Sequence, residues 1–222
     1  MARYEGLADW YDDQFPSPFA EAVADVVRDL LGRGDGECLD VGCGGGHYVA
    51  TIAALGWRVT GLDESEDQLR VAGAAAGAVG AALVKGDATA LPFHDASFDA
   101  VTALMVSTDI EPYERVVGEA GRVLRPGAPF VHVGVHPCFA GPHTILRDDG
   151  RMLGTGYRSR AYKRTSPAFS PVGIRARVGA SHVPLDDLLN AVVTSGLRLE
   201  RVIERWSDPP VMLALLGRRE PA

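Results

Sequence analysis

Hydrophobic positions follow two different patterns along the chain, a helical period and short continuous runs. Apolar residues from Phe19 to Leu31 recur at intervals of three and four, which predicts an amphipathic helix over 18–32. Short continuous apolar runs predict strands at 37–42, 57–62, 81–85, 98–104, 128–135, 198–204 and 210–217. Further helices are predicted at 46–55, 65–76, 112–124 and 185–193. This alternation predicts an α/β fold with a doubly wound, mostly parallel sheet and helices on both faces.

The first predicted strand ends in a glycine turn of the form D-x-G-x-G-x-G, made by Asp40, Gly42, Gly44 and Gly46. Glycine at such a turn lets the backbone adopt positive φ and lets a ligand approach the main chain closely. The amides at the start of the following helix would face that ligand. A dinucleotide fingerprint needs its third glycine where this chain has His47. The turn therefore predicts a nucleoside cofactor but departs from the nicotinamide and flavin form.

The next two strand ends also carry carboxylates. Asp63 ends the second strand, 21 residues after Gly42, which is the spacing at which a carboxylate reaches ribose hydroxyls. That spacing suits a nicotinamide dehydrogenase equally, so Asp63 does not separate the two kinds of enzyme. The third strand leads into Gly86, Asp87 and Ala88. Because ligands of such sheets bind beyond the carboxyl ends of the strands, we expect all these residues at one site.

Two further motifs lie downstream of the third strand. Residues 86–99 form the pattern G-D-A-x-x-L-P-F-x-D-x-S-F-D, and the turn L-R-P-G follows at 124–127. Together with the glycine turn, these motifs resemble those of class I S-adenosylmethionine-dependent methyltransferases, in particular the small-molecule group of ubiquinone biosynthesis. The resemblance covers residues 4 to about 135. It implies a single domain over 1–222 with a Rossmann-like sheet in the order 3-2-1-4-5-7-6, its last strand antiparallel.

The resemblance also implies S-adenosylmethionine as the cofactor and S-adenosylhomocysteine as the product. In that family, the aspartate that matches Asp87 accepts a hydrogen bond from the adenine amino group, and the amide matching Ala88 assists. A tyrosine-containing segment, matched here by Tyr4 and Tyr11 with Glu5 in place of an aspartate, folds over the cofactor. The expected cofactor-binding residues are Tyr4, Tyr11, Asp40, Gly42, Cys43, Gly44, Gly46, Asp63, Glu64, Gly86, Asp87, Ala88, Met105 and Val106.

Residues 136–182, called the basic segment below, differ in charge from the rest of the chain. They contain eight Arg or Lys and two Asp, a net charge of +6 in a chain of net charge −7. In the family this region often forms a cap over the substrate. A cationic cap could focus an acidic or polar acceptor onto the site, with Arg147 and Arg158 as contacts. The alternative is a solvated loop whose cations pair with acidic groups of the same chain.

Methyl transfer to a hydroxyl or an acidic carbon also needs a group that accepts a proton. We expect His136, at the end of the fifth strand, to be this base, with His143, Tyr113 and Asp109 as further candidates beside the substrate. The alternative for His136 is a turn residue before Pro137. No metal site is expected, since the three cysteines include no C-x-x-C pair.

Charge and composition argue against several functions. An acidic chain is a poor ligand for nucleic acid. Residues 103–107 also lack the Asn/Asp-Pro-Pro-aromatic motif of many amino-methylating nucleic-acid enzymes. No apolar run approaches the ~20 residues of a membrane span, and the first residues include no signal-peptide apolar region. We therefore expect a cytoplasmic protein, monomeric or homodimeric, that contacts neither nucleic acid nor membrane.

These observations predict a methyltransferase of a small-molecule acceptor, with oxygen favoured as the acceptor atom and a polar or acidic metabolite of specialised metabolism as its class. Nitrogen and carbon acceptors, on a small molecule or a peptide, stay open. A nicotinamide dehydrogenase is one competing class. A non-catalytic protein of the same fold that binds S-adenosylmethionine is the other.

Overall fold

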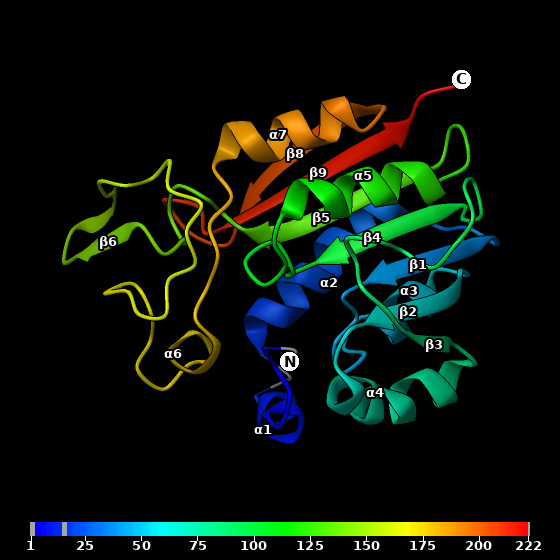
Figure 1. The fold of residues 1–222 in the computed structure, drawn as a ribbon, viewed down its shortest axis with the longest axis horizontal. Coiled ribbons are helices and arrows are strands. Elements are labelled where there is room, and N and C mark those ends of the chain that lie inside the picture. Colours follow the sequence, from blue (N-terminus) through cyan, green and yellow to red (C-terminus); the bar gives the residue numbers. More distant parts are fainter. Residues whose placement is uncertain (1–2, 15–16, 222) are drawn as a thin grey trace.

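The computed structural model describes residues 3–14 and 17–221, and its centre is a seven-stranded sheet (Figure 1). Across the sheet lie, in order, β3 (Ala82–Lys85), β2 (Arg58–Asp63), β1 (Glu37–Val41), β4 (Ala100–Leu104), β5 (Pro129–Val135), β9 (Met212–Arg219) and β8 (Leu197–Arg205). The strands from β3 to β5 pair in parallel, whereas β9 is antiparallel to β5 and to β8. The predicted topology is confirmed. The predicted sixth and seventh strands are β8 and β9 here, because a separate two-stranded hairpin takes the numbers β6 and β7.

Helices cover both faces of this sheet. On one face lie α2 (Pro18–Leu31), α3 (Val49–Ala54) and α4 (Glu66–Val79), and on the other lie α5 (Tyr113–Val123) and α7 (Leu185–Thr194) (Figure 1). Val27 and Ile52 belong to the core under the first face, and Val117 and Leu188 belong to the core under the second. The central parallel strands are therefore buried on both sides, which explains why they are continuous apolar runs in the sequence.

Local side chains set the ends of these helices. The Ser17 hydroxyl caps α2 by accepting a hydrogen bond of 3.1 Å from the Ala20 amide. Ser65 caps α4 in the same way, and Gly80, in the left-handed conformation, ends α4 three residues beyond the predicted limit at residue 76. Among the helices of the described part of the chain, none is long and apolar enough to cross a membrane.

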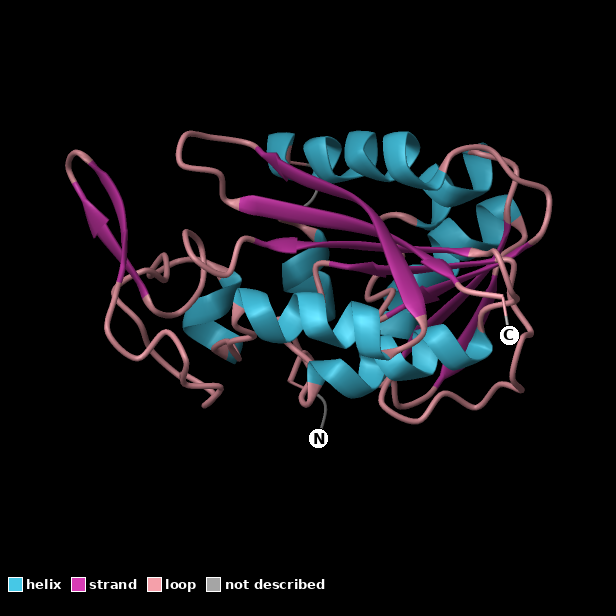
Figure 2. Cartoon of the chain, turned by 90° about the horizontal axis from the view of Figure 1, so that it is seen from above, coloured by secondary structure: helices cyan, strands magenta, loops and turns pink. Residues whose placement is uncertain are grey.

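Several short elements differ from the prediction. Helix α3 begins at Val49 rather than at residue 46, because Gly46 has a φ of +80° and its amide closes a turn onto the Cys43 carbonyl. Elements that the sequence does not predict are α1 (Ala8–Asp12), α6 (Ile174–Val178) and a hairpin of β6 (Thr144–Arg147) and β7 (Gly150–Leu153). The hairpin projects away from the sheet (Figure 2), and its side chains are mostly exposed, so it lacks the alternating burial of a half-buried strand.

Tyr113 lies in the core, which corrects the expectation that it contacts the substrate. It is 1% exposed at the start of α5, and its hydroxyl shares a hydrogen bond of 2.6 Å with Nδ1 of His132 on β5. Burial raises the pKa of Tyr113 and lowers the pKa of His132 to about 4. Both side chains are therefore neutral at neutral pH, and their contact joins α5 to the sheet.

Replacing Tyr113 by Phe should destabilise the fold, because the substitution leaves the buried His132 Nδ1 without its partner. The expected loss is about 1–3 kcal/mol in the free energy of unfolding, measured by urea denaturation. The double variant Tyr113→Phe/His132→Met removes both polar groups and should recover part of that loss. A single variant as stable as the wild type would contradict this role of the hydrogen bond.

Candidate cofactor and active site

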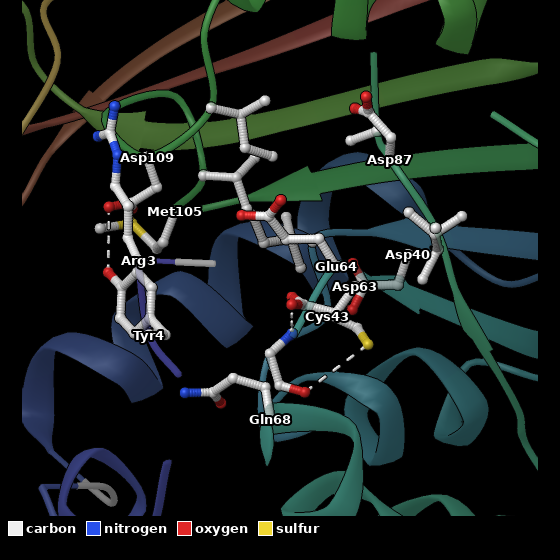
Figure 3. A pocket seen from close by; sticks show the side chains of 18 of the residues that line it. Arg3, Tyr4, Asp40, Cys43, Asp63, Glu64, Gln68, Asp87, Met105 and Asp109 are labelled. Carbon is white, nitrogen blue, oxygen red and sulfur yellow. Dashed lines mark hydrogen bonds between the residues drawn. The ribbon is translucent and has the colours of Figure 1, made fainter. Parts of the chain in front are cut away.

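A cavity of about 450 Å³ lies at the carboxyl ends of β1, β2, β3 and β4. Figure 3 shows Tyr4 and Asp109 at one end of this cavity and Asp87 at the other, with Asp63 between them. The residues that were expected to bind a cofactor and that line the cavity are Tyr4, Tyr11, Asp40, Gly42, Cys43, Gly44, Asp63, Glu64, Gly86, Asp87, Ala88, Met105 and Val106. The structure thus brings the strand-end motifs and the N-terminal tyrosines together around one space.

The glycines of the turn have two different roles, one at the cavity and one in helix packing. Gly42 has a φ of +69°, and a Cβ there would lie 2.5 Å from Cγ1 of Val106, so a side chain would collide with the loop after β4. Gly46 does not line the cavity. A Cβ on Gly46 would lie 3.2 Å from the Cβ of Ala72, so this glycine permits the close approach of α4. The expectation that Gly46 touches the cofactor is therefore replaced by a packing role.

The carboxylate of Asp63 is held in one orientation by the backbone on either side of it. One oxygen accepts a hydrogen bond of 2.9 Å from the Gly44 amide, and the other accepts one of 3.0 Å from the Ser65 amide. Burial nevertheless raises the pKa of Asp63. At the next strand end, one oxygen of Asp87 accepts from the Thr89 amide and hydroxyl at 2.7 and 2.8 Å. Both carboxylates are thus fixed before any ligand binds.

The cavity is strongly acidic. Arg3 is the only Lys or Arg among the described residues that line it. Its carboxylates come from Asp40, Asp63, Glu64, Asp87, Asp109 and Glu111. Like charges held close together favour a ligand that brings positive charge, and they oppose the pyrophosphate of a nicotinamide dinucleotide. The electrostatics of the cavity therefore favour a cationic nucleoside over a dinucleotide.

Asp40 shows most clearly how burial among other carboxylates disfavours the ionised form of an acid. The residue is 2% exposed, and burial raises its pKa to about 7, although the Thr102 hydroxyl donates a hydrogen bond of 2.7 Å that opposes the shift. The charge of Asp63 adds to the rise. A cation in the cavity would favour the ionised form of Asp40 and so couple ligand binding to loss of a proton.

Gln68 is a lining residue that the motifs did not indicate. Its side chain is buried in the first turn of α4, yet both the oxygen and the nitrogen of its amide lack a hydrogen-bond partner within the described structure. A buried amide normally finds partners, so this side chain is suited to a ligand that both donates and accepts. The sequence indicates the position of this residue only through its place three residues after the helix cap Ser65. Other lining residues that the motifs did not indicate are Arg3, Tyr48, Leu62, Thr89, Leu104, Ile110 and Glu111.

Aromatic side chains form one wall of the cavity. The rings of Tyr4 and Tyr11 meet edge to face at 5.4 Å, and Tyr11 contacts the His47 ring at 5.9 Å. The Tyr4 hydroxyl donates a hydrogen bond of 3.1 Å to Asp109. Burial raises the pKa of Tyr11 to about 12 and raises that of Tyr4 as well. The wall is therefore neutral, and its ring faces can contact a cation favourably.

The candidate bases are dispersed. His136 lies outside the cavity, where its Nε2 is 2.7 Å from Oε1 of Glu204 on β8 and its Nδ1 accepts from a backbone amide two residues on. His143 is buried elsewhere, edge-on to His182 with ring centroids 4.9 Å apart. Of the four candidates, Asp109 is the one that lines the cavity. The geometry places Asp109 beside a ligand of the cavity, with Arg175 donating to both of its oxygens, and it gives no support to His136 as the base.

The cations expected to meet an acidic acceptor do not line the cavity. Arg158 pairs with Asp186 at 3.0 Å, and Arg160 pairs with Asp187 at 2.6 Å, both at the start of α7. Arg147 is exposed at the end of β6. Part of the positive charge of the basic segment is therefore paired with acidic groups of the same chain, as in the alternative above.

Fold and site together define a nucleoside-binding α/β protein whose cavity suits a cation. Residues 39–132 match the family model described as a methyltransferase domain. Demethylmenaquinone methyltransferase of Staphylococcus aureus is 39% identical over 106 residues, which are 46% of this chain and 44% of that protein. The chain spans less than half the length of the curated relatives that it matches first.

Two solved structures share the fold over most of this chain. An S-adenosylmethionine-dependent methyltransferase of Mesorhizobium loti has a TM-score of 0.72 and 24% identity, covering 90% of this chain and 98% of that one. The cyclase SpnF has a TM-score of 0.65 and 17% identity, covering 91% of this chain and 81% of that one. Residues 39–132 are therefore similar to a methyltransferase domain, and the fold is shared with a solved S-adenosylmethionine-dependent methyltransferase.

Replacing Gln68 by Met should weaken binding of S-adenosylhomocysteine and stabilise the free protein. Met has a similar volume and no group that needs a hydrogen bond, so the variant removes a buried cost of about 1–3 kcal/mol. Affinity should fall about 3- to 10-fold in calorimetry, since one neutral hydrogen bond contributes about 1 kcal/mol. The urea midpoint of the free protein should rise. Unchanged affinity together with lower stability would exclude a ligand contact for Gln68.

Affinity for S-adenosylmethionine should increase with pH through about 7. Below that pH, Asp40 is largely protonated in the free protein, and a bound cation must draw it into the ionised form. The expected loss between pH 8 and pH 6 is about tenfold, with a proton released on binding at the lower pH. Calorimetry in buffers of different ionisation heat measures both. Asp40→Asn should flatten this dependence, and an unchanged pH profile in that variant would assign it to another group.

Proposed function

We propose that this protein transfers a methyl group from S-adenosylmethionine to an oxygen of a small polar or acidic molecule in specialised metabolism. The observation that carries the proposal is the acidic cavity at the glycine turn, with Asp40, Asp63 and Asp87 at three neighbouring strand ends. The cofactor is a nucleoside with a positively charged sulfur. Carboxylates at the strand ends attract its positive charge. They can also accept hydrogen bonds from its ribose hydroxyls and its adenine amino group.

Individual residues have distinct parts in this proposal. Asp63 would accept from the ribose hydroxyls, because its carboxylate is already oriented by two backbone amides. Asp87 and the amide of Ala88 would hold the adenine, at the end of the cavity away from Tyr4 (Figure 3). When bound, the cofactor supplies an electrophilic methyl group. The protein then mainly has to align the acceptor and exclude water, which can contribute about 7–11 kcal/mol.

The end of the cavity near Tyr4 is suited to the acceptor. Arg3 and Asp109 line it there (Figure 3), and Glu111 lies 3.6 Å from Arg3. Methylation of a hydroxyl releases a proton, as does methylation of a neutral amine, and a carboxylate at this end can accept it. Arg3 would exchange its contact with Glu111 for a negative group on the acceptor. The excess of carboxylates also gives a reason to include cationic amines among the acceptors tested.

The related fold of SpnF, described as a cyclase, means that fold similarity alone does not define the reaction. Binding and turnover therefore need separate measurements. Calorimetry with S-adenosylmethionine, S-adenosylhomocysteine and NADH tests the cofactor. Transfer of labelled methyl groups to a panel of hydroxy acids, phenols and amines tests the reaction. Labelled products from hydroxy compounds would support the proposal, whereas tight cofactor binding without transfer to any acceptor would favour a non-catalytic role.

Asp63→Ala should weaken binding of S-adenosylhomocysteine about 10- to 100-fold, because hydrogen bonds to a charged acceptor contribute about 1.5–3 kcal/mol. Asp148→Ala is the matched control, since this aspartate is exposed in the turn of the β6–β7 hairpin. That control should bind like the wild type. Wild-type affinity in Asp63→Ala would refute the ribose contact.

A further inference from the structure

Two segments that are far apart in the sequence meet beside the cavity. The side chain of Arg3 donates a hydrogen bond of 3.0 Å to Ser181, and its guanidinium lies 4.5 Å from the centre of the Tyr162 ring. On α6, the guanidinium of Arg177 lies 4.0 Å from the centre of the Trp10 ring of α1. Residues 3–14, called the N-terminal segment below, and the basic segment therefore pack on each other through side chains.

Asp109 connects these two segments to the cavity. It follows β4 in the loop that also carries Met105, and it lines the cavity beside Tyr4 (Figure 3). One of its oxygens accepts from the Tyr4 hydroxyl at 3.1 Å. Arg175 of α6 donates to both oxygens, with a distance of 2.9 Å from Nη2 to Oδ2. Arg175 itself does not belong to the cavity lining.

The contact between Arg175 and Asp109 is suited to fix orientation. A guanidinium that donates to both oxygens of one carboxylate restrains rotation of that carboxylate as well as its position. The two side chains are only 21% and 13% exposed, so water screens the pair weakly. Arg175 also donates to the Gly179 carbonyl at 3.3 Å, which ties its guanidinium to the end of α6. The orientation of Asp109, in turn, sets the position of the Tyr4 hydroxyl.

We propose that Arg175 is a positioning residue that holds Tyr4 over the cofactor cavity through Asp109. The N-terminal segment then closes on the cofactor only when the basic segment is seated against it. On this view, one cation of the basic segment serves the cofactor site rather than attracting an acidic acceptor. The inference rests on the proposed function, because it takes the ligand of the cavity to be S-adenosylmethionine.

The test uses the full-length protein and S-adenosylhomocysteine as the probe. Arg175→Met removes the charge and keeps an apolar stem, whereas Arg175→Lys keeps the charge and loses the paired geometry. Arg164→Met is the matched control, since Arg164 is an exposed cation of the same segment. We expect Arg175→Met to weaken affinity about tenfold through faster dissociation, Arg175→Lys to lie between it and the wild type, and Arg164→Met to stay within about twofold.

A double-mutant cycle with Tyr4→Phe separates positioning from a general loosening of the fold. If both residues act through Asp109, the combined variant should lose clearly less affinity than the product of the two single losses. Independent, multiplicative losses would overturn the inference, as would wild-type affinity in Arg175→Met. Should Arg175→Met fail to fold, the cycle is run with Arg175→Lys and decides in the same way. A wild-type protein that does not bind the probe would instead overturn the proposed function, and the inference with it.

Discussion

The site depends on the parallel pairing of β1 with β2 and β4, because this pairing sets its carboxylates and its glycine turn beside one another. Asp40 on β1 lies opposite Gly61 on β2 and Thr102 on β4. A Cβ on Gly61 would be 2.8 Å from Sγ of Cys43, so glycine at this position lets the turn after β1 lie against β2. Thr102 is the hydrogen-bond donor to Asp40. One strand register therefore determines both the shape of the cavity and the protonation of its most buried acid.

The buried polar groups of the cavity reduce the stability of the free protein, and this loss of stability indicates where a ligand binds. Burial raises the pKa of Asp40 and of Asp63, which means that the fold disfavours their ionised forms. Such groups oppose folding at the pH where they must ionise, and a ligand that brings positive charge offsets the penalty. The buried amide of Gln68 is unfavourable in the same way, since the described residues offer it no hydrogen-bond partner. Unfavourable groups gathered at one place thus identify a binding site independently of any motif.

The cofactor end of the site could be predicted from the sequence because each residue follows a strand whose apolar run is visible locally. The prediction of Asp63 rested on a strand end and its spacing from Gly42, and that of Asp87 on a strand end together with the family resemblance of residues 86–99. The acceptor end could not be predicted in this way. Asp109 meets Arg175 across 66 residues, and the histidine expected as the base, His136, meets Glu204 across 68. These contacts depend on how irregular segments pack, and such packing has no period in the sequence.

The two ends of the cavity are consequently built by different means. Strand ends and backbone amides fix the cofactor end, which is rigid because it belongs to the sheet. The other end is made by an N-terminal segment and a basic segment that contact each other through side chains, so changes there can alter which acceptor fits while the sheet stays intact. The loop after β4 joins the two ends, because Met105 lies on the cavity wall and Asp109, four residues later, contacts both Tyr4 and Arg175. On the proposed function, the contact to the cofactor-covering Tyr4 and the space for the acceptor therefore meet at a single carboxylate.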